Sequence, residues 1–440
     1  MIVMKFGGSS VESAEAIERV ANIVIDRRHQ RPIVVVSAMG KTTNRLLEIA
    51  SLAVNGQRSQ ALDQLQALQD YHHQHADPYG AKPVIQEHFQ ELAELVRGLA
   101  ILGELTPRSI DAITSFGERL SSRIVAVAIG AKHIDSRHVI VTDERHTMAA
   151  PLYHETNEKL AATAWGDITV MGGFIAATRA GVTTTLGRGG SDFTASIVGA
   201  GIGASEIQIW TDVDGMLTCD PTVLPGGRRV KSMSFAEAAE LAYFGAKVLH
   251  PATVLPAVEK NIPVLILNSR RPHVAGTRIT AEGPVTSSVA KSIACKKNIT
   301  LVNIQSSRML MAHGFLRRIF EVFDRHETPV DMVATSEVSV SLTIDNAAKM
   351  DQIAAELRNF AEVEIEQQQA IVCLVGDNIR WQKGVAARVF GALSGINIRM
   401  ISQGASLRNL GFVVAQADLR QAVESLHSEF FTEVDPEVFE

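Results

Sequence analysis

Short, uninterrupted runs of Val and Ile constrain the fold of this chain more than any other feature. Four of them occupy Ile33–Val36, Ile168–Met171, Ile207–Trp210 and Val264–Leu267, with helical patterns between them. Apolar runs that do not alternate with polar residues are typical of strands buried on both faces of a parallel sheet. A further strand-like segment, Ile2–Met4, stands at the N-terminus. We therefore expect a mainly parallel α/β/α sandwich.

Each run ends in small or polar residues. The segments that follow are Ser37–Gly40, Gly172–Phe174, Thr211–Gly215 and Asn268–Arg270. Ligands of open parallel sheets bind at the carboxyl ends of the strands. These turns are therefore where we expect the chemistry.

Residues from about 57 to 103 have a different texture, being rich in Gln, His, Leu and Ala at helical spacing. We interpret them as a helical insertion. His72, His73 and His75 lie in it without a spaced carboxylate partner. A solvated helix end is therefore favoured over a metal site.

A weak internal repeat begins past about Ser292. When the tail is shifted by about 70 residues, Gly314 and Ile319–Phe320 match Gly384 and Val389–Phe390. Each repeat predicts a strand, a turn, a helix that opens at the Gly, and two further strands. Units this small cannot each bury a full face, so they should pack against each other or against a partner chain.

Composition narrows the class of partner. The chain has 42 Lys and Arg against 48 Asp and Glu, a net charge of −6, which argues against a nucleic acid or a membrane surface. Its three cysteines, Cys219, Cys295 and Cys373, form no CxxC motif and no disulfide framework, so a reducing cytoplasm is the expected setting. No apolar run reaches the ~18 residues that a membrane span needs. At 440 residues the chain should contain two or three domains.

The segment Lys5–Ser10 follows the first strand and precedes a helical stretch, Glu15–Val24. A lysine beside a glycine turn at a helix N-terminus places a cation and backbone N–H groups together, which is a phosphate cradle. The two glycines are equally compatible with a plain tight turn, and this segment alone leaves both interpretations open.

A second glycine-rich segment, Thr183–Asp192, contains Gly187, Gly189 and Gly190 around Arg188. Its glycines allow backbone to approach an anion, and Arg188 can grip a carboxylate with two hydrogen bonds. Asp192 either caps the next helix or orients Lys5 or a substrate ammonium group.

Three further segments hold weaker candidates. Glu118, before an apolar helix, can hold an ammonium group or can simply be a first-turn acid. Thr211 and Asp212 can meet a nucleotide or can form an ordinary Asp-Gly turn. Lys247 is a second phosphate cation or a surface lysine.

Two motifs are set aside. Gly40–Thr42 resembles the end of a P-loop, but Val35 stands where its first glycine should be. Gly199–Gly203 resembles a dinucleotide fingerprint but follows a helix and precedes a strand, which is the reverse of the required order. We interpret it as a helix stop.

Taken together, these segments resemble the aspartate kinases of the amino-acid kinase family over nearly the whole chain. The strings that carry the resemblance are Lys5–Val11, Ser115–Glu118, Leu186–Asp192, Trp210–Gly215 and Gly245–Pro251. The tail resembles the tandem ACT domains of this family in Gly314–Leu316 and Thr335–Val340. The resemblance implies a catalytic domain over 1–291 followed by two ferredoxin-like ACT units over 292–367 and 368–440.

The resemblance also implies a reaction, in which the γ-phosphoryl group of Mg-ATP moves to the β-carboxylate of L-aspartate to give 4-phospho-L-aspartate. This is the first step towards lysine, threonine and methionine. Such a transfer depends on positioning and charge neutralisation, and needs no covalent nucleophile. The magnesium ion would come with ATP, held by phosphates and water, with no ligand set supplied by the protein alone.

Site roles follow residue by residue from the same resemblance. Lys5 and Asp192 are the implied catalytic pair. The implied nucleotide contacts are Lys5, Phe6, Gly7, Gly8, Thr211, Asp212 and Lys247. The implied substrate contacts are Ser37, Thr43, Glu118, Phe174, Arg188, Gly190, Ser191 and Asp192.

The chain departs from lysine-sensitive relatives on the nucleotide side. Leu217 and Thr222 stand where those relatives carry a tyrosine near the adenine and an arginine near the phosphates. We hypothesise that Arg228 or Arg229 replaces the missing cation.

In the tail, the implied effector contacts are Met309, Phe315, Leu316, Val330, Asp331, Ser336 and Glu337. Lysine is the first choice of inhibitor because Asp331 could pair with its amine, with threonine or weak regulation as alternatives. The ACT resemblance implies a homodimer or larger homo-oligomer. The rival functions are a kinase for another amino acid such as glutamate, and a catalytically silent amino-acid sensor.

Overall fold

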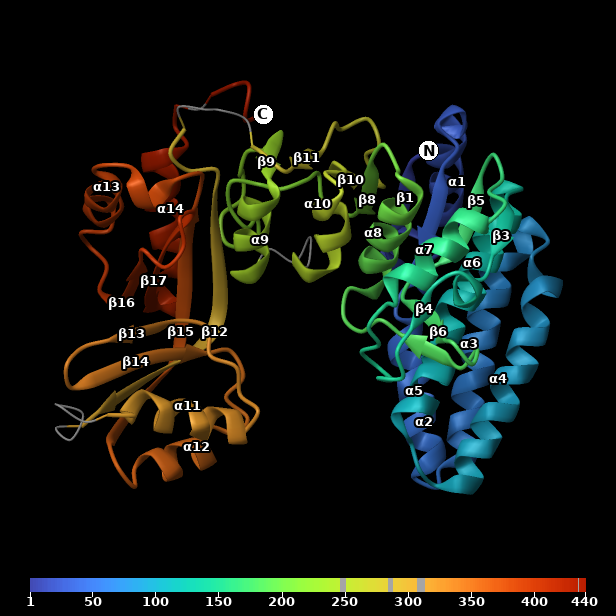
Figure 1. Cartoon of the computed structure of the whole chain (residues 1–440), viewed down its shortest axis with the longest axis horizontal. Helices are drawn as coiled ribbons and strands as arrows, with labels where there is room; N and C mark the ends of the chain where they lie inside the picture. Colours follow the sequence, from blue (N-terminus) through green and yellow to red (C-terminus); the bar gives the residue numbers. More distant parts are fainter. Residues whose placement is uncertain (246–250, 284–287, 307–312, 434) are drawn as a thin grey trace. The chain divides into compact units, whose positions relative to one another are not determined.

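The structure is a computed structural model of the whole chain, and it describes residues 1–245, 251–283, 288–306, 313–433 and 435–440. Two compact units emerge from the contacts within the chain (Figure 1). The first comprises Met1–Met216 with Val248–Glu282, and the second comprises Leu217–Lys247 with Gly283–Glu440.

A mainly parallel sheet forms the centre of the first unit, in the order β3-β5-β2-β1-β8-β10-β11. Its strands are β1 (Val3–Phe6), β2 (Ile33–Val36), β3 (Lys132–Ile134), β5 (Thr169–Gly172), β8 (Ile207–Thr211), β10 (Val264–Asn268) and β11 (Thr277–Thr280). All neighbours pair in parallel except β10 and β11. A smaller sheet has the order β4-β6-β7, made of β4 (Val141–Thr142), β6 (Ile175–Thr178) and β7 (Thr183–Thr185). The four strands expected from the Val and Ile runs are confirmed as β2, β5, β8 and β10.

Helices cover both faces of this sheet, as the α/β/α expectation requires. The longer ones are α1 (Ala14–Asp26), α2 (Thr42–Val54), α3 (Arg58–Ala76), α4 (Lys82–Leu102), α5 (Pro107–Thr114), α6 (Phe116–Ile129), α7 (Tyr153–Ala162), α8 (Gly190–Ile202) and α10 (Leu255–Glu259). Single 3-10 turns occupy Gly8–Ser10, Arg28–Gln30, Asp77–Tyr79, Ser136–His138 and Pro251–Val254. On one face α1 and α6 share a core with the strands, and on the other α8 packs against β1, with α7 and α10 on its outer side.

The alternation of side chains along β1 determines which face of the sheet its only charged residue, Lys5, occupies. Met4 and Phe6 are fully buried in the core shared with α1 and α6, where Phe6 stacks on Trp210 with ring centroids 5.7 Å apart. Successive side chains of a strand point to opposite faces, so Lys5 points towards α8. This one-residue offset places a cation at the carboxyl end of the sheet, on the face where α8 begins.

The segment predicted as a helical insertion forms α3 and α4, which lie side by side (Figure 1). The prediction of a solvated helix end is wrong for His72, which is fully buried in α3. Its Nδ1 lies 2.8 Å from the Leu68 carbonyl oxygen, its ring meets Phe89 edge-on, and burial lowers its pKa to about 4. The apolar stripe of α3 simply includes this position. Within the described residues, no cluster of His, Cys, Asp or Glu could hold a metal ion.

The glycine segment read as a helix stop is partly confirmed. Helix α8 ends at Ile202, with Gly203 in the left-handed conformation after it. Gly199 and Gly201, however, lie inside the helix. A Cβ on Gly199 would lie 2.7 Å from Ile207 Cδ1, and one on Gly201 2.4 Å from Leu160 Cδ1. These two glycines therefore allow α8 to pack closely.

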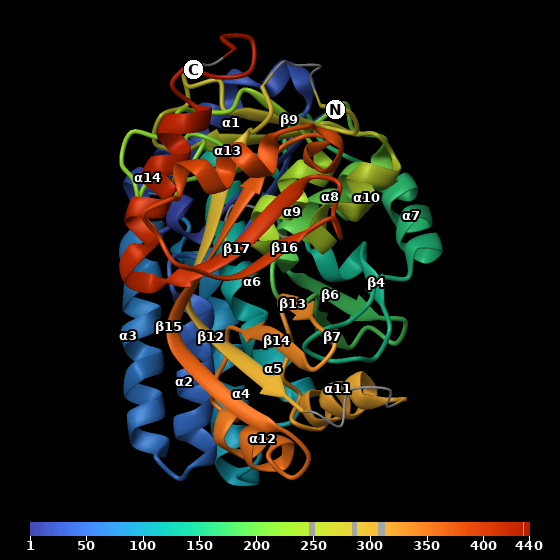
Figure 2. The ribbon, with the colours of Figure 1, turned by 90° about the vertical axis from the view of Figure 1, so that its left-hand side faces the viewer.

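One antiparallel six-stranded sheet organises the second unit, in the order β13-β14-β12-β15-β17-β16 (Figure 2). Its strands are β12 (Ser292–Gln305), β13 (Val333–Thr335), β14 (Ser339–Ile344), β15 (Glu362–Val375), β16 (Ile398–Gln403) and β17 (Asn409–Ala415). The unit also contains β9 (Ser232–Ser234) and the helices α9 (Phe235–Tyr243), α11 (Phe315–Arg325), α12 (Met350–Leu357), α13 (Val385–Ala392) and α14 (Leu419–Phe430). Single 3-10 turns occupy Ile379–Trp381 and Gln416–Asp418.

The two tail repeats meet through β12 and β15, which are 14 residues long each. The second half of β12 pairs with β14, and the second half of β15 pairs with β17. The two long strands also pair with each other along their whole length. The boundary expected between 367 and 368 lies inside β15, because each long strand serves both halves of the sheet. This continuity buries the faces that a single repeat would leave exposed.

Among the described residues, none of the helices combines the length and the apolar character that crossing a membrane requires.

Candidate active site

A cleft of about 290 Å³ lies where β1, β2 and β5 end and α8 begins. Five segments of chain contribute its lining, which comprises Lys5, Gly8, Ser37, Ala38, Gly40, Thr43, Glu118, Phe174, Gly187, Gly189, Gly190, Ser191 and Asp192. The structure thus gathers almost all of the substrate contacts expected from the sequence. Ala38 and Gly40 were not among them, although they belong to the turn after β2 where chemistry was expected.

Lys5 and Asp192 form an ion pair in this cleft, with Lys5 Nζ 2.8 Å from Asp192 Oδ1. The side chains are only 13% and 15% exposed. Asp192 does not cap α8, since the helix begins at Gly190 after Gly189, and no side chain caps it. Of the two interpretations of Asp192, the structure therefore favours orientation of Lys5. A shielded cation held by one carboxylate is well suited to meet a phosphate.

Glu118 lies in the first turn of α6 and is 3% exposed. Its Oε1 accepts a hydrogen bond from the Ala38 N–H at 3.0 Å, whereas its Oε2 has no partner among the described residues. Burial raises the pKa of this carboxyl to about 8, and the hydrogen bond from Ala38 opposes the rise only in part. A buried carboxylate with one free oxygen at a cleft wall has room for a cationic partner.

Glycines bring the walls of the cleft close together. A Cβ on Gly8 would lie 2.8 Å from the Ala38 carbonyl oxygen, and one on Gly173 would lie 2.6 Å from Ser191 Cβ. Gly7 is less available for a ligand than expected, because its N–H already donates to the Trp210 carbonyl at 3.2 Å. Gly8 is therefore the better candidate for a backbone contact with phosphate.

Arg188 is the one expected substrate contact that the structure leaves outside the cleft. Its side chain is exposed, while Gly187 and Gly189 on either side line the cavity, both with positive φ. The loop thus presents Arg188 at the rim of the cleft. The Arg188 side chain would have to turn inward to contact a substrate carboxylate. Phe174, also at positive φ, is held by its N–H, which donates to Thr194 Oγ1 at 2.9 Å.

Asp111 carries no motif that marks it in the sequence, yet it fixes the loop that supplies part of the cleft. It is fully buried in α5 and accepts hydrogen bonds from the Thr147 N–H at 3.0 Å and from Thr185 Oγ1 at 2.5 Å. His146 Nδ1 lies 2.7 Å from its other oxygen. Thr185 is the last residue of β7 and lies in the glycine-rich segment, shortly before its first glycine, Gly187. The only signal for this role in the sequence was that Asp111 is a single acidic residue just before the Ser115–Glu118 string.

Two protein families match parts of this chain. The amino acid kinase family matches residues 1–268, and the ACT domain family matches residues 372–430. Aspartokinase 2, chloroplastic, of Arabidopsis thaliana is 40% identical over 464 positions, which cover 99% of this chain and 85% of that protein.

The chain belongs to the aspartokinase family.

Lysine-sensitive aspartokinase 3 of Escherichia coli is 37% identical to it, covering 98% of this chain and 99% of that protein. Among solved structures, E. coli aspartokinase III in complex with lysine and aspartate matches with a TM-score of 0.84 at 35% identity. That match covers 98% of this chain and 99% of the other. The same enzyme in complex with aspartate and ADP matches with a TM-score of 0.82.

The nucleotide contacts that the aspartokinase resemblance implied are placed only in part. Thr211 ends β8, and its Oγ1 donates to Asp212 Oδ1 at 3.2 Å at the exposed end of the strand. Phe6 is buried against Trp210, so only its backbone could face a ligand. Lys247 lies outside the described residues.

Leu217 and Thr222 are the two positions at which the chain was predicted to depart from lysine-sensitive aspartokinases, and a lysine lies beside the second. Lys297 Nζ lies 3.5 Å from Thr222 Oγ1. Arg229 is buried and pairs with the Glu440 carboxylate, whereas Arg228 is exposed. Arg228 and Lys297 thus carry exposed cationic side chains, whereas the side chain of Arg229 is already paired.

The candidate effector residues of the aspartokinase tail differ in what they contact. Phe315 is buried against Phe360, and Val330 packs on the same core. Asp331 Oδ1 lies 2.9 Å from Lys296 Nζ, so its charge is already paired, while its Oδ2 has no partner among the described residues. Leu316, Ser336 and Glu337 are exposed, and Met309 lies outside the described residues.

Proposed function

We propose that this chain transfers the γ-phosphoryl group of ATP to the β-carboxylate of L-aspartate, giving 4-phospho-L-aspartate. The observation that carries the proposal is the Lys5–Asp192 ion pair facing Glu118 across one cleft, in a chain of the aspartokinase family. Phosphoryl transfer passes through a loose transition state whose charge is spread over oxygens. A preorganised cation and backbone N–H groups are what such a state needs.

Within this proposal, Lys5 Nζ meets the transferring phosphoryl group and Asp192 keeps the lysine in place. The Gly8 N–H contributes from the turn, because Gly8 lines the cleft and cannot carry a side chain without striking the Ala38 carbonyl. The acceptor is the substrate's own carboxylate, so no protein nucleophile takes part.

Glu118 and Arg188 hold the two ends of aspartate. The free Oε2 of Glu118 receives the α-ammonium group, which also offsets the cost of ionising a buried carboxyl. Arg188 grips the α-carboxylate from the rim once its side chain turns inward. Ser37, Thr43, Phe174, Gly190 and Ser191 line the remainder of the cleft.

Magnesium would be held by the phosphates of ATP, water and at most one or two protein carboxylates, as is usual for nucleotide-bound Mg²⁺. Asp192 in the cleft and Asp212 directly after β8 are our candidates for such a limited role. The bound ion would neutralise charge on the phosphates.

Regulation and assembly extend the proposal. We assign the catalytic domain to 1–291 and ACT units to 292–367 and 368–440; the ACT family match to 372–430 and the shared sheet support the second assignment.

Lysine is the proposed inhibitor, since the E. coli relative was solved with lysine, and a homodimer or larger homo-oligomer is the proposed assembly. The three cysteines are free and buried, in keeping with the predicted reducing, cytoplasmic setting.

The substrate is tested by trapping the acyl phosphate with hydroxylamine. With ATP and Mg²⁺, the intact chain should form aspartyl hydroxamate and little or no glutamyl hydroxamate. A preference for glutamate would indicate another amino-acid kinase, and no product with either substrate would indicate a silent sensor.

A second experiment tests the cation proposed on the phosphate side. Lys297→Ala and Arg228→Ala should each be measured for a raised KM for ATP; an unchanged KM in both would reject these two residues.

A further inference from the structure

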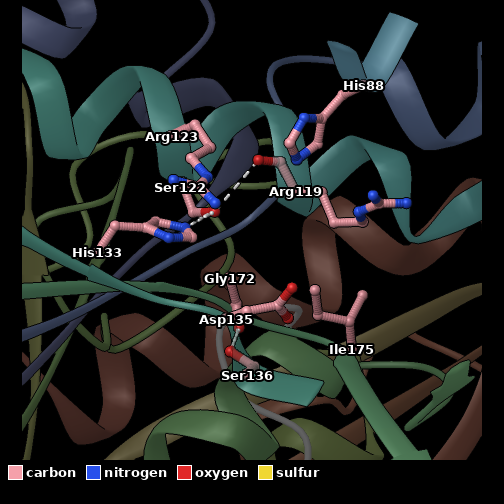
Figure 3. A pocket seen from close by; sticks show the side chains of 9 residues that line it. All are labelled: His88, Arg119, Ser122, Arg123, His133, Asp135, Ser136, Gly172 and Ile175. Carbon is pink, nitrogen blue, oxygen red and sulfur yellow. Dashed lines mark hydrogen bonds between the residues drawn. The ribbon is translucent and has the colours of Figure 1, made fainter. Parts of the chain in front are cut away.

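A second, much smaller cavity of about 10 Å³ lies behind α6 (Figure 3). Its lining comes from α4, α6, β3, β5, β6 and the turn after β3, and comprises His88, Arg119, Ser122, Arg123, His133, Asp135, Ser136, Gly172 and Ile175. A cavity of this size accepts one water molecule or one monatomic ion, and nothing larger.

The charges around this cavity do not balance. Arg119 pairs with Glu91, and Asp135 pairs with Arg137. Arg123 has no carboxylate within ion-pair distance among the residues that the structure describes. Its side chain is half-buried and its Nε is fully buried, so one positive charge beside the cavity is left without a partner, which suits an anion.

Hydrogen-bond donors are also in surplus. The Nε atoms of Arg119 and Arg123 and the Nδ1 atom of His88 are buried without a hydrogen-bond partner among the described residues. An arginine Nε always carries its hydrogen, so at least two donors lack an acceptor.

The acceptors around the cavity are already used. Ser136 Oγ donates to the Gly172 carbonyl, and Ser122 Oγ lies 3.0 Å from His133 Nε2. The Asp135 oxygens accept hydrogen bonds from Arg137, at 3.0 Å from its Nε and 2.6 Å from its Nη2. A water molecule would have to donate as well as accept, whereas an anion only accepts. The arrangement therefore favours an anion.

The pKa values of the two histidines reflect positive charge around the cavity. Burial, followed by the charges of Arg119 and Arg123, lowers the pKa of His88. Burial and Arg123 likewise lower the pKa of His133 to about 4. Both rings are therefore neutral near pH 7, and the positive charge beside the cavity comes from the arginines.

We propose that this cavity binds one monatomic anion of the halide class between α4, α6 and the end of β5. The site stands one layer behind the cleft: Arg119 follows Glu118 on α6, and a Cβ on Gly172 would lie 3.1 Å from Glu118 Cβ. The anion braces the wall that carries Glu118. The cavity is distinct from the cleft, so the proposal does not depend on the identity of the substrate.

The direct test is a crystal of the intact chain grown or soaked in sodium bromide. We expect an anomalous difference peak inside the cavity, within contact distance of the Arg119 and Arg123 side chains. Density for a water molecule with no anomalous signal at high bromide would overturn the proposal.

A solution test compares chloride with gluconate at constant ionic strength. Because a ligand that binds only the folded state raises stability in a saturable way, chloride should raise the unfolding midpoint by about 2 °C and then level off. Arg123→Gln should abolish this chloride-specific rise, while Arg97→Gln, at an exposed arginine of α4, should keep it. No saturable rise in the unmodified chain, or the same rise in Arg123→Gln, would contradict the site.

Discussion

Glu118 is a buried acid in the wall of the cleft. Its carboxyl has a pKa of about 8 in the folded chain against a usual 4.5, because burial disfavours the charge. Between these two values the folded state holds a proton that the unfolded state has lost. Stability is therefore greatest below pH 4.5 for this group and falls as pH rises to about 8.

Replacing Glu118 with Gln should remove this loss. We expect Glu118→Gln to be more stable than the unmodified chain at pH 8, by on the order of 3 kcal/mol, and to differ little at pH 5. Urea unfolding at both pH values measures the difference. The same variant should bind aspartate poorly, since an amide does not attract an ammonium group. Equal stability of the two chains at pH 8 would show that Glu118 is not a buried, strained acid.

Much of the residue-level site was predictable, and its gaps have physical causes. Lys5, Glu118 and Asp192 were named from their strings, and the structure brings all three to one cleft, while their roles there stay predictions. The exposed position of Arg188 was not predictable, because a glycine-rich loop leaves its side-chain direction undetermined. The burial of His72 was missed because a histidine in a Gln-rich helix appears solvated until the packing of α3 on α4 is known.

At the scale of elements, the loop between β7 and α8 depends on an anchor in another helix. Asp111 in α5 holds Thr185 at the end of β7 and the Thr147 N–H beside it. Thr147 itself has φ of 71°, a conformation that a non-glycine residue adopts only when its surroundings require it. The first glycine of the Thr183–Asp192 segment, Gly187, follows shortly after Thr185, so the position of this loop follows from the anchor.

We expect Asp111→Asn to raise the KM for aspartate by roughly 10-fold with little change in the KM for ATP, because only the aspartate side of the cleft shifts. Asp167→Asn, at an exposed acid, serves as the control. Steady-state kinetics with each substrate varied in turn gives both constants. If both KM values rise together, or neither does, Asp111 does not position this loop.

The parallel sheet was anticipated from the Val and Ile runs alone, whereas its order of strands was not predicted. The tail was only half anticipated. The repeat predicted two units that pack together, but pairing of β12 with β15 along 14 residues needs long-range register that no local pattern encodes. Strand length is set by the partner strand as much as by the sequence of the strand itself.

On the scale of the whole molecule, the second unit is the place where regulation is expected. Asp331 is the candidate contact for an effector amine, although Lys296 already pairs with it. We expect lysine to inhibit the intact chain and Asp331→Asn to weaken that inhibition at least several-fold without changing the uninhibited rate. Titration of activity with lysine and threonine, separately and together, measures the effect. Insensitivity to both amino acids would refute feedback control.

The cleft around Lys5 is proposed to transfer the γ-phosphoryl group of ATP to aspartate. The sharpest test is the rate of aspartyl hydroxamate formation by the intact chain and by Lys5→Met, with Lys41→Met, at an exposed lysine, as the matched control. We predict product from the unmodified chain and from Lys41→Met, and a loss of at least about 100-fold in Lys5→Met. No aspartyl hydroxamate from the unmodified chain, or an undiminished rate in a folded Lys5→Met, would contradict the claim.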